Sequence, residues 1–442
     1  MPHRPGTSEA RWLAWCLALA PALACRVTDQ RFREVPAEPR LITPSSMSRV
    51  TRQSPTLRWV LGPGGGTPSV ELCKDRACTM ALPIGTTLGD DLLSAVPNAM
   101  LPIGWVYWRV RVTLGDQQVV SPTWQFWVGR TATGAPPDVD SSSGMIFDVN
   151  GDGYADLLVA APASRTATET GGVVHVYLGS AMPTVAGWNG ATPTQRIDIV
   201  PPANVPGFAN ATISPIGDLN GDGFADFIVG EPFAVDGSGT TAGVAYLYLG
   251  SATPSADRWN GAGAPDRIEL ADPDGPNATF GRPAVGVADI NGDGFADFLV
   301  ASSPYGGVQP AHVYLGSATP GKDGWTGASP ALRVDLSNPD GVNAIFDVVT
   351  SVGDVNGDGY VDFAIGTSGP AGKNEGAAHV YLGSAAPSGA TWNGDSPAAR
   401  IDIATPDGDG GKFFNVASAG DVNGDGFADL LVGAPASAAG VG

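Results

Sequence analysis

One nine-residue pattern of oxygen-bearing side chains occurs five times in the chain. Each copy has the form Asp-x-Asn-Gly-Asp-Gly-aromatic-x-Asp, and successive copies start 70, 71, 65 and 67 residues apart. Oxygen atoms at positions 1, 3, 5, 7 and 9 of such a loop can surround one hard cation, and Ca²⁺ takes about six to eight oxygen ligands. The pattern therefore predicts five calcium sites.

Each loop is expected to supply side-chain oxygens from positions 1, 3, 5 and 9 and a backbone carbonyl from the aromatic residue at position 7, whose ring we expect to pack inward. Glycines at positions 4 and 6 permit backbone conformations that a Cβ would resist. The predicted ligands are Asp148, Asn150, Asp152, Tyr154 and Asp156; Asp218, Asn220, Asp222, Phe224 and Asp226; Asp289, Asn291, Asp293, Phe295 and Asp297; Asp354, Asn356, Asp358, Tyr360 and Asp362; and Asp421, Asn423, Asp425, Phe427 and Asp429.

Three other interpretations of the loops are weaker. EF-hand and dockerin loops need an acidic residue at position 12 and a helix after it, whereas position 12 is aliphatic in every copy here, from Val159 to Val432. A metal-free Asn/Asp/Gly turn explains one copy, but not three carboxylates at fixed positions in five copies, since like charges this close repel without a cation. Magnesium prefers stricter octahedral geometry and retained waters.

The overall charge agrees with bound cations and disfavours nucleic acid. The chain has 24 Lys and Arg against 44 Asp and Glu, a formal net charge of −20. Phosphate binding needs clustered basic residues, so no nucleic-acid partner is expected. Five divalent ions would bring the formal charge from −20 to −10. With 61 Gly and 38 Pro, the composition suits many short strands better than long helices.

The elements that position the loops repeat with them. An apolar stretch follows each loop, as at residues 227–232, and a second ends in Tyr-Leu-Gly, as at 246–250. A loop with one tryptophan, a short stretch that begins with arginine, and a phenylalanine-containing stretch complete the unit. Four short strands at this period form one blade of a β-propeller.

The repeat resembles the FG-GAP repeat of integrin alpha subunits and their bacterial relatives, through Phe280-Gly281 and the Gly-Ala-Pro at 433–435 beside the acidic loops. The resemblance covers residues 144–442 and implies an all-β fold, a β-propeller of about four and a half to five blades. The family closes more blades than these. We therefore expect a fragment, incomplete closure, or closure by another chain. The first unit has only residues 144–147 for its inner strand, and the last lacks two strands.

The N-terminus has the pattern of an export signal. Arg4 and Arg11 precede an apolar run at residues 12–24, which is too short to span a bilayer. We predict a signal peptide at 1–24 and, because the residues before Cys25 resemble a lipobox, lipidation of Cys25. Simple cleavage after Ala24 is the alternative. The protein is thus expected to be exported, as a cell-envelope lipoprotein or a secreted protein, with membrane contact only through that anchor.

A small β-domain is expected between a tether at residues 25–45 and a linker at 131–143. Alternating strand-like runs and the tryptophans at 59, 105 and 108 resemble a fibronectin type III-like β-sandwich at 46–130; a generic small β-domain is the alternative. Cys73 and Cys78 are expected to form a disulfide in an exported chain. Zinc is disfavoured because no histidine is close.

The expected function is a calcium-stabilised surface binding or adhesion module without catalytic activity. The recurring histidines (175, 312 and 379) are expected at packed strand positions. The tryptophans at 188, 259, 325 and 392 either hold their loops or stack on sugar rings, so a lectin-like propeller is one alternative. A non-catalytic part of an exported hydrolase and an architectural envelope component are others. The partner is a protein or glycan, contacted through variable loops such as 163–171 and 234–241.

Overall fold

The computed structural model describes most of the chain after residue 37. The described residues are 38–44, 46, 48–50, 52–62, 64–128, 146–162, 172–190, 193–202, 208, 212–235, 239–261, 263–275, 279–302, 308–326, 330–369, 376–404, 413–420, 422–423 and 427–434. They belong to one unit, Pro36–Gly442. The predicted signal peptide, Cys25 and the 131–143 linker lie outside them, as do Asp421 and Asp425. Within the described residues, no helix is long and apolar enough to cross a membrane.

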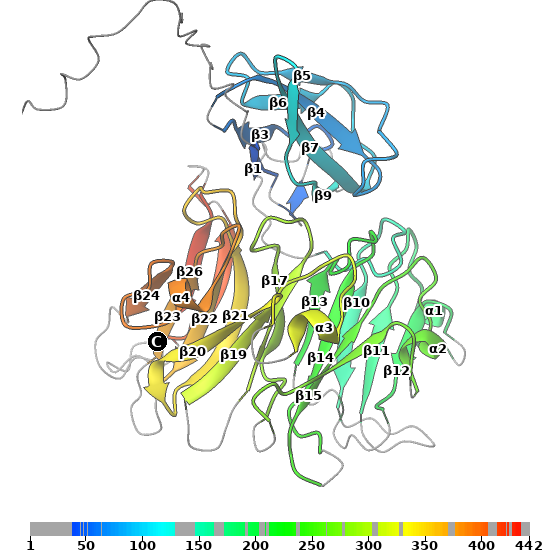
Figure 1. Ribbon diagram of the computed structural model, residues 1–442. Helices are drawn as coiled ribbons and strands as arrows, with labels where there is room; N and C mark the ends of the chain where they lie inside the picture. The colour runs from blue at the N-terminus through cyan, green and yellow to red at the C-terminus, as the bar shows by residue number, and fades with distance from the viewer. Residues whose placement is uncertain are drawn as a thin grey trace, which may run out of the picture. The chain divides into compact units, whose positions relative to one another are not determined.

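Residues 40–128 form two β-sheets, hereafter the sandwich (Figure 1). The first sheet has the order β1 (Arg40–Thr43), β3 (Leu57–Val60), β6 (Ser94–Pro97) and β5 (Thr86–Leu88). The second has the order β2 (Arg49–Val50), β9 (Trp124–Val128), β7 (Gly104–Leu114) and β4 (Thr67–Cys73), with β8 (Gln117–Val120) paired to β7.

The sandwich core comes from strand alternation. In β3, Leu57 and Trp59 are buried and their neighbours exposed, and they pack with Trp108 and Phe126 of the other sheet. The expected tether end at residue 45 is wrong, because β1 already pairs with β3. The prolines beside β1 resemble a linker in sequence, but an edge strand tolerates them. The fibronectin type III likeness stays a prediction.

Residues 157–433 form the blades of the expected β-propeller, and the fold is all-β. Blade 1 has β10 (Leu157–Ala161), β11 (Val173–Tyr177) and β12 (Arg196–Ile199). Blade 2 has β13 (Thr212–Gly217), β14 (Asp226–Glu231), β15 (Val244–Tyr248) and β16 (Arg267–Ala271). Blade 3 has β17 (Ala284–Ala288), β18 (Asp297–Ala301), β19 (Val308–Tyr314) and β20 (Arg333–Val342). Blade 4 has β21 (Ile345–Gly353), β22 (Asp362–Ser368), β23 (Gly376–Tyr381) and β24 (Arg400–Ala404), and blade 5 has β25 (Asn415–Gly420) and β26 (Asp429–Gly433).

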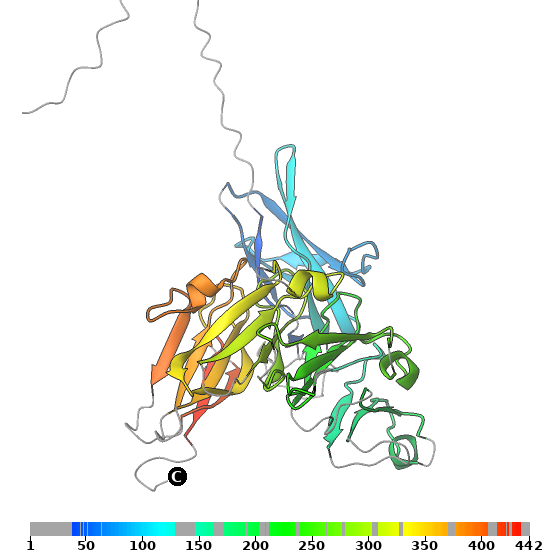
Figure 2. The ribbon, with the colours of Figure 1, turned by 60° about the horizontal axis from the view of Figure 1, so that its bottom comes forward.

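All blades are antiparallel and follow one another in chain order (Figure 2). The first strands of blades 2 to 5 pack on one another, as β13 does on β17. Because the strands alternate in direction, the first-to-second and third-to-fourth connections share one end of each blade. We call that end the metal-loop face. The second-to-third connections and the links between blades lie at the other end, the opposite face.

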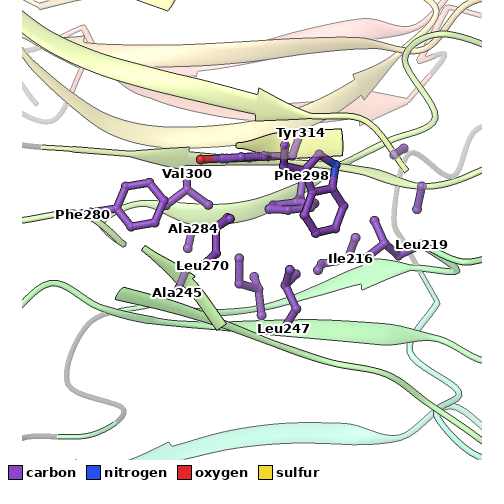
Figure 3. Packing of buried hydrophobic residues seen from close by; sticks show 14 of the residues in the cluster. Ile216, Leu219, Ala245, Leu247, Leu270, Phe280, Ala284, Phe298, Val300 and Tyr314 are labelled. Carbon is purple, nitrogen blue, oxygen red and sulfur yellow. The ribbon is translucent and has the colours of Figure 1, made fainter. Parts of the chain in front are cut away.

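Each middle blade contains the same aromatic cluster. Phe298 and Tyr314 stack with ring centroids 4.9 Å apart, and Trp325 meets Phe298 edge-on at 5.4 Å. Blades 2 and 4 repeat this arrangement. Figure 3 shows that these rings belong to a cluster that also holds Ile216 and Leu247 of blade 2. Neighbouring blades therefore share apolar clusters, and three further clusters join the other pairs of blades.

The tryptophans hold their loops. Each lies at the end of a short helix: α1 (Val185–Asn189), α2 (Ala256–Trp259), α3 (Lys322–Trp325) or α4 (Gly389–Trp392). Trp259, Trp325 and Trp392 are fully buried, and each indole N–H donates to the backbone carbonyl at the end of its third strand, at 2.9, 2.9 and 3.0 Å. Trp188 is half-buried and makes the same bond. Stacking of sugars on the three buried rings is excluded.

Candidate metal centres

In blades 2 to 5 the acidic loops connect the first and second strands on the metal-loop face, and in blade 1 the loop precedes β10, which corresponds to the second strand of the other blades. These loops are loop 1 (residues 148–156), loop 2 (218–226), loop 3 (289–297), loop 4 (354–362) and loop 5 (421–429). Strands, not helices, follow them, as position 12 predicted. The structure describes loops 1 to 4 in full and, of loop 5, residues 422–423 and 427–429.

The carboxylate at position 1 holds the loop backbone. In loop 2, Asp218 Oδ1 accepts the N–H groups of Gly221 at 2.6 Å and Asp222 at 3.0 Å, and Oδ2 accepts that of Gly223 at 3.0 Å. Loops 1 and 4 make the same three bonds. Asp218 is fully buried, so its negative charge lies inside the loop.

Positions 3 and 5 form the outer side of the loop. Asn220 Nδ2 donates to Asp222 Oδ2 at 3.0 Å, and Asp222 Oδ1 accepts the N–H of Phe224 at 3.0 Å. The Asn220 side-chain oxygen accepts the N–H of Asp222 at 3.1 Å. The same contacts recur in loops 1, 3 and 4. Four predicted ligands of each of these loops therefore lie on one short hydrogen-bonded turn.

The carboxylate at position 9 ties the loop to the third strand of its blade. Asp226 Oδ2 accepts the N–H of Leu219 at 2.8 Å, and Oδ1 accepts that of Gly250, just after β15, also at 2.8 Å. The aspartates at position 9 of loops 1, 3 and 4 bridge in the same way. This bridging role was not predicted from the sequence. The glycine that ends every Tyr-Leu-Gly stretch could have indicated it, because its N–H is the donor to the aspartate at position 9.

The aromatic ring at position 7 packs on the preceding loop. Phe224 lies against Gly151, so a Cβ there would come within 2.8 Å of the ring. Phe295 lies on Gly221, Tyr360 on Gly292 and Phe427 on Gly357 in the same way. The inward packing expected for this ring is thus packing from loop to loop. The ligand role of the position 7 carbonyl stays a prediction.

Buried negative charge accumulates in the loops. Burial, together with the neighbouring aspartates of the same loop, raises the pKa of Asp148 to about 6, of Asp156 to about 7 and of Asp362 to about 8. Burial and then the neighbouring aspartates raise the pKa of Asp226 and Asp297 well above the ordinary value. A cation among these carboxylates would favour their ionised form.

The donor set fits calcium. Each of loops 1 to 4 holds three carboxylates and one amide oxygen, the hard ligands that Ca²⁺ takes. An ionised carboxylate offers about four lone pairs, so an oxygen that accepts a backbone N–H can also bind an ion. When bound, the ion supplies positive charge. The chain's part is to fix the oxygens through the loop N–H groups and the third strand.

A second acidic group, which sequence analysis missed, lies near the opposite end of blade 3. Among the described residues, Asp272, Asp274 and His312 place ligand atoms within 4.8 Å of one another. His312 is buried, with Nε2 at 3.1 Å from Asp274 and Nδ1 at 2.7 Å from Asp335. His379 of blade 4 likewise contacts Asp402 of its own blade and Asp340, which lies in β20 of blade 3. We interpret both histidines as bridges between their own blade and the chain segment that leads into it from the preceding blade.

A disulfide and a repeated arginine make further anchoring contacts. Cys73 and Cys78 form the expected disulfide. The arginine that begins each fourth strand anchors the tryptophan loop: Arg333 donates to the Trp325 carbonyl at 2.9 Å and pairs with Asp335 at 2.6 Å. Blades 1 and 4 repeat both contacts.

Comparison with known proteins agrees with the repeat. The FG-GAP repeat family matches residues 141–177, 210–248, 282–319, 346–381 and 413–442, each containing one acidic loop. Similar proteins include the phosphatidylinositol-glycan-specific phospholipase D of Dictyostelium discoideum (31% identity, 38% of this chain and 18% of that protein), chicken integrin alpha-6 (31%, 34% and 12%) and human integrin alpha-7 (32%, 36% and 12%). The chain thus spans less than a fifth of their length. The chain is an integrin-alpha-like FG-GAP repeat protein.

Proposed function

We propose that this protein is an exported adhesion module in which calcium holds the blades together and the opposite face binds a protein ligand. The observation that carries the proposal is the stacking of the four fully described loops. Their buried carboxylates need a cation, and the ring at position 7 of loops 2, 3 and 4 rests on the preceding loop. Calcium therefore stabilises the contacts between blades as well as each loop.

The opposite face offers apolar contact area. Phe233 is 48% exposed, and it lies in the connection between β14 and β15. Val342 and Ile345, 54% and 44% exposed, flank the link between blades 3 and 4. Exposed apolar side chains on loops suit protein contact. The buried tryptophans favour a protein over a glycan ligand, and the similarity to integrin alpha chains supports adhesion.

Adhesion is tested with the full chain coated on beads, in calcium and in chelator. The probes are purified extracellular-matrix proteins and a glycan array. We expect calcium-dependent binding to a protein that weakens in the Phe233→Ser, Val342→Ser double variant. Met182→Ser is the matched control, since this exposed residue lies in a third-to-fourth connection on the metal-loop face. Binding to glycans alone contradicts the proposed ligand class, and equal loss in both variants contradicts the proposed face.

The non-catalytic role and the location belong to the same proposal. One relative is named as a phospholipase D, so phosphodiesterase and esterase screens of the purified chain are the direct test, and we expect no turnover. Metabolic labelling with a fatty acid tests the lipid anchor. We expect label in the wild-type chain and none in Cys25→Ser; label that persists in the variant contradicts lipidation at this cysteine.

A further inference from the structure

We propose that the sandwich is a cap that binds the metal-loop face, and that its disulfide-closed loop inserts Arg76 between loops 2 and 3 as the anchor. This interaction surface lies within the chain, and its partner is the acidic repeat itself. The sandwich is then a docked part of the propeller, in place of the spacer that its position along the chain indicates.

Arg76 contacts both loops. Its Nη2 lies 3.9 Å from Asp218 Oδ2 of loop 2, and that carboxylate is fully buried while the Arg76 side chain is 15% exposed. The guanidinium carbon lies 4.5 Å from the centre of the Phe295 ring of loop 3, within the range of a cation–π contact. A single cation therefore faces an acidic group of one loop and an aromatic ring of the next.

The fit leaves no room for a side chain at two of the loop glycines. A Cβ at Gly221 would come within 2.5 Å of Arg76 Nε, and one at Gly294 would overlap Arg76 Nη1 and the Thr123 carbonyl. At Gly153, the position of loop 1 that corresponds to Gly294, a Cβ would meet open space. Arg76 therefore closely approaches loops 2 and 3, and no such approach exists at Gly153 of loop 1.

Neighbouring sandwich residues extend the interface. The Trp124 indole N–H donates to the Gly292 carbonyl of loop 3 at 3.0 Å. Gln125, fully buried, donates from Nε2 to Asp218 Oδ2 at 3.4 Å and accepts from Arg76 Nη2 at 3.0 Å. At loop 4, a Cβ on Gly359 would meet the Leu41 carbonyl within 2.6 Å and Arg40 Nη1 within 2.7 Å. Strands β1 and β9 and the disulfide-closed loop of the sandwich therefore contact loops 2, 3 and 4.

The disulfide gives the anchor its shape. Cys73 ends β4, and the bond to Cys78 closes a turn with Arg76 near its middle. Asp75 fixes the same turn by accepting the N–H groups of Thr79 at 3.1 Å and Met80 at 2.7 Å. A long flexible side chain loses conformational entropy when it docks. A rigid turn reduces the additional ordering that docking requires.

Hydrogen exchange and small-angle X-ray scattering on the full chain test the cap. In Arg76→Ala we expect amide exchange in loops 2 and 3 to rise by roughly tenfold, because those loops lose their cover, and the radius of gyration to increase. Arg76→Lys keeps the charge, so its exchange rates and radius of gyration should lie between those of the wild type and those of Arg76→Ala. Arg109→Ala is the matched control, since Arg109 pairs with Glu71 inside the sandwich and should leave both readouts unchanged.

Exchange in β4, β7, β14 and β18 reports whether both parts stay folded. If the sandwich strands of Arg76→Ala lose protection, Trp124→Phe decides, because it removes the indole N–H that bonds to loop 3, keeps an aromatic ring in the sandwich core, and should raise exchange in loop 3. Wild-type exchange in loops 2 and 3 together with an unchanged radius of gyration in the folded Arg76→Ala variant would overturn the proposal. So would an equal rise in Arg109→Ala.

Discussion

The middle blades and the end blades contain the same acidic loop in different surroundings. In blades 2 to 4 the aspartate at position 9 is fully buried, and the second strands are buried along nearly their whole length. In blade 1, Asp156 is half-buried and Leu157 is 53% exposed; in blade 5, Leu431 is 63% exposed. The difference shows that neighbouring strands, more than the loop sequence, set how strongly each carboxylate is buried.

The number of strands in each blade explains this difference in burial. Blade 1 has three strands in the described chain, because residues 146–148 form no strand beside β10, although Phe147 is buried there. The described part of blade 5 has two strands. In a repeat protein each unit is stabilised mainly by its neighbours. An identical loop should therefore contribute more in the middle of the array than at its ends.

Removal of calcium should have the largest effect. At a calcium concentration about ten times the dissociation constant, each occupied site stabilises the fold by about 1.4 kcal/mol. Several sites together should shift the unfolding midpoint by about 10 °C. Calorimetry with and without chelator measures this, and hydrogen exchange should show a greater loss of protection in loop 3 than in loop 1. An unchanged midpoint would contradict the calcium assignment itself.

Removal of the carboxylate at position 9 should destabilise the protein more in a middle blade than in an end blade. Asp297→Ala leaves the N–H groups of Ile290 and Gly316 without their acceptor in a fully buried place, at a cost of about 3 kcal/mol. Asp156→Ala removes the same two kinds of bond where water can replace them, so the cost should be about 1 kcal/mol. Urea unfolding in calcium buffer compares the two variants. Equal losses of unfolding free energy in the two variants would show that burial by neighbouring strands does not set the contribution of this carboxylate.

The ring contacts between loops allow a finer comparison. Gly292 and Gly357 have nearly the same φ, +70° and +73°, so alanine pays a similar backbone cost of about 1 kcal/mol at each. Tyr360, which rests on Gly292, is half-buried, whereas Phe427, which rests on Gly357, is 43% exposed and can turn away. Gly292→Ala should therefore lose about 1 kcal/mol more in urea unfolding. A larger loss in Gly357→Ala would contradict the comparison.

The sequence was informative where the chemistry is local. The loop ligands, the strand order within a blade and the disulfide follow from short spacings, and the structure agrees with the strand order and with Cys73–Cys78. Contacts between distant segments were not predictable. The sequence around Arg76 contains no pattern that predicts its contact with Phe295 of loop 3. Likewise, the sequence of loop 1 does not predict that the Phe224 ring packs on Gly151. These contacts depend on how blades and sandwich pack, for which a single sequence has no local signal.

The smallest expected effect concerns the histidine bridges. Burial lowers the pKa of His312, but the bonded Asp274 and Asp335 outweigh it and hold the pKa above its ordinary value. Asp272 also lies near the ring, and Arg333 pairs with Asp335. A raised pKa in the folded state means that the bridge stabilises the protein fully below the unfolded pKa of about 6.5 and that this contribution is lost as pH rises through the folded pKa.

The His312→Gln variant should therefore lose up to about 1 kcal/mol near pH 5.5 and less near pH 9, measured as urea midpoints across that range. His175→Gln is the control from an end blade: His175 is half-buried and pairs with Asp198 alone among the described ion pairs. If contacts with neighbouring blades stabilise the middle blades more than the end blades, the loss of stability should change more between pH 5.5 and pH 9 in His312→Gln than in His175→Gln. The same pH profile in both variants would mean that the second carboxylate, supplied by the link from blade 2, does not strengthen the bridge.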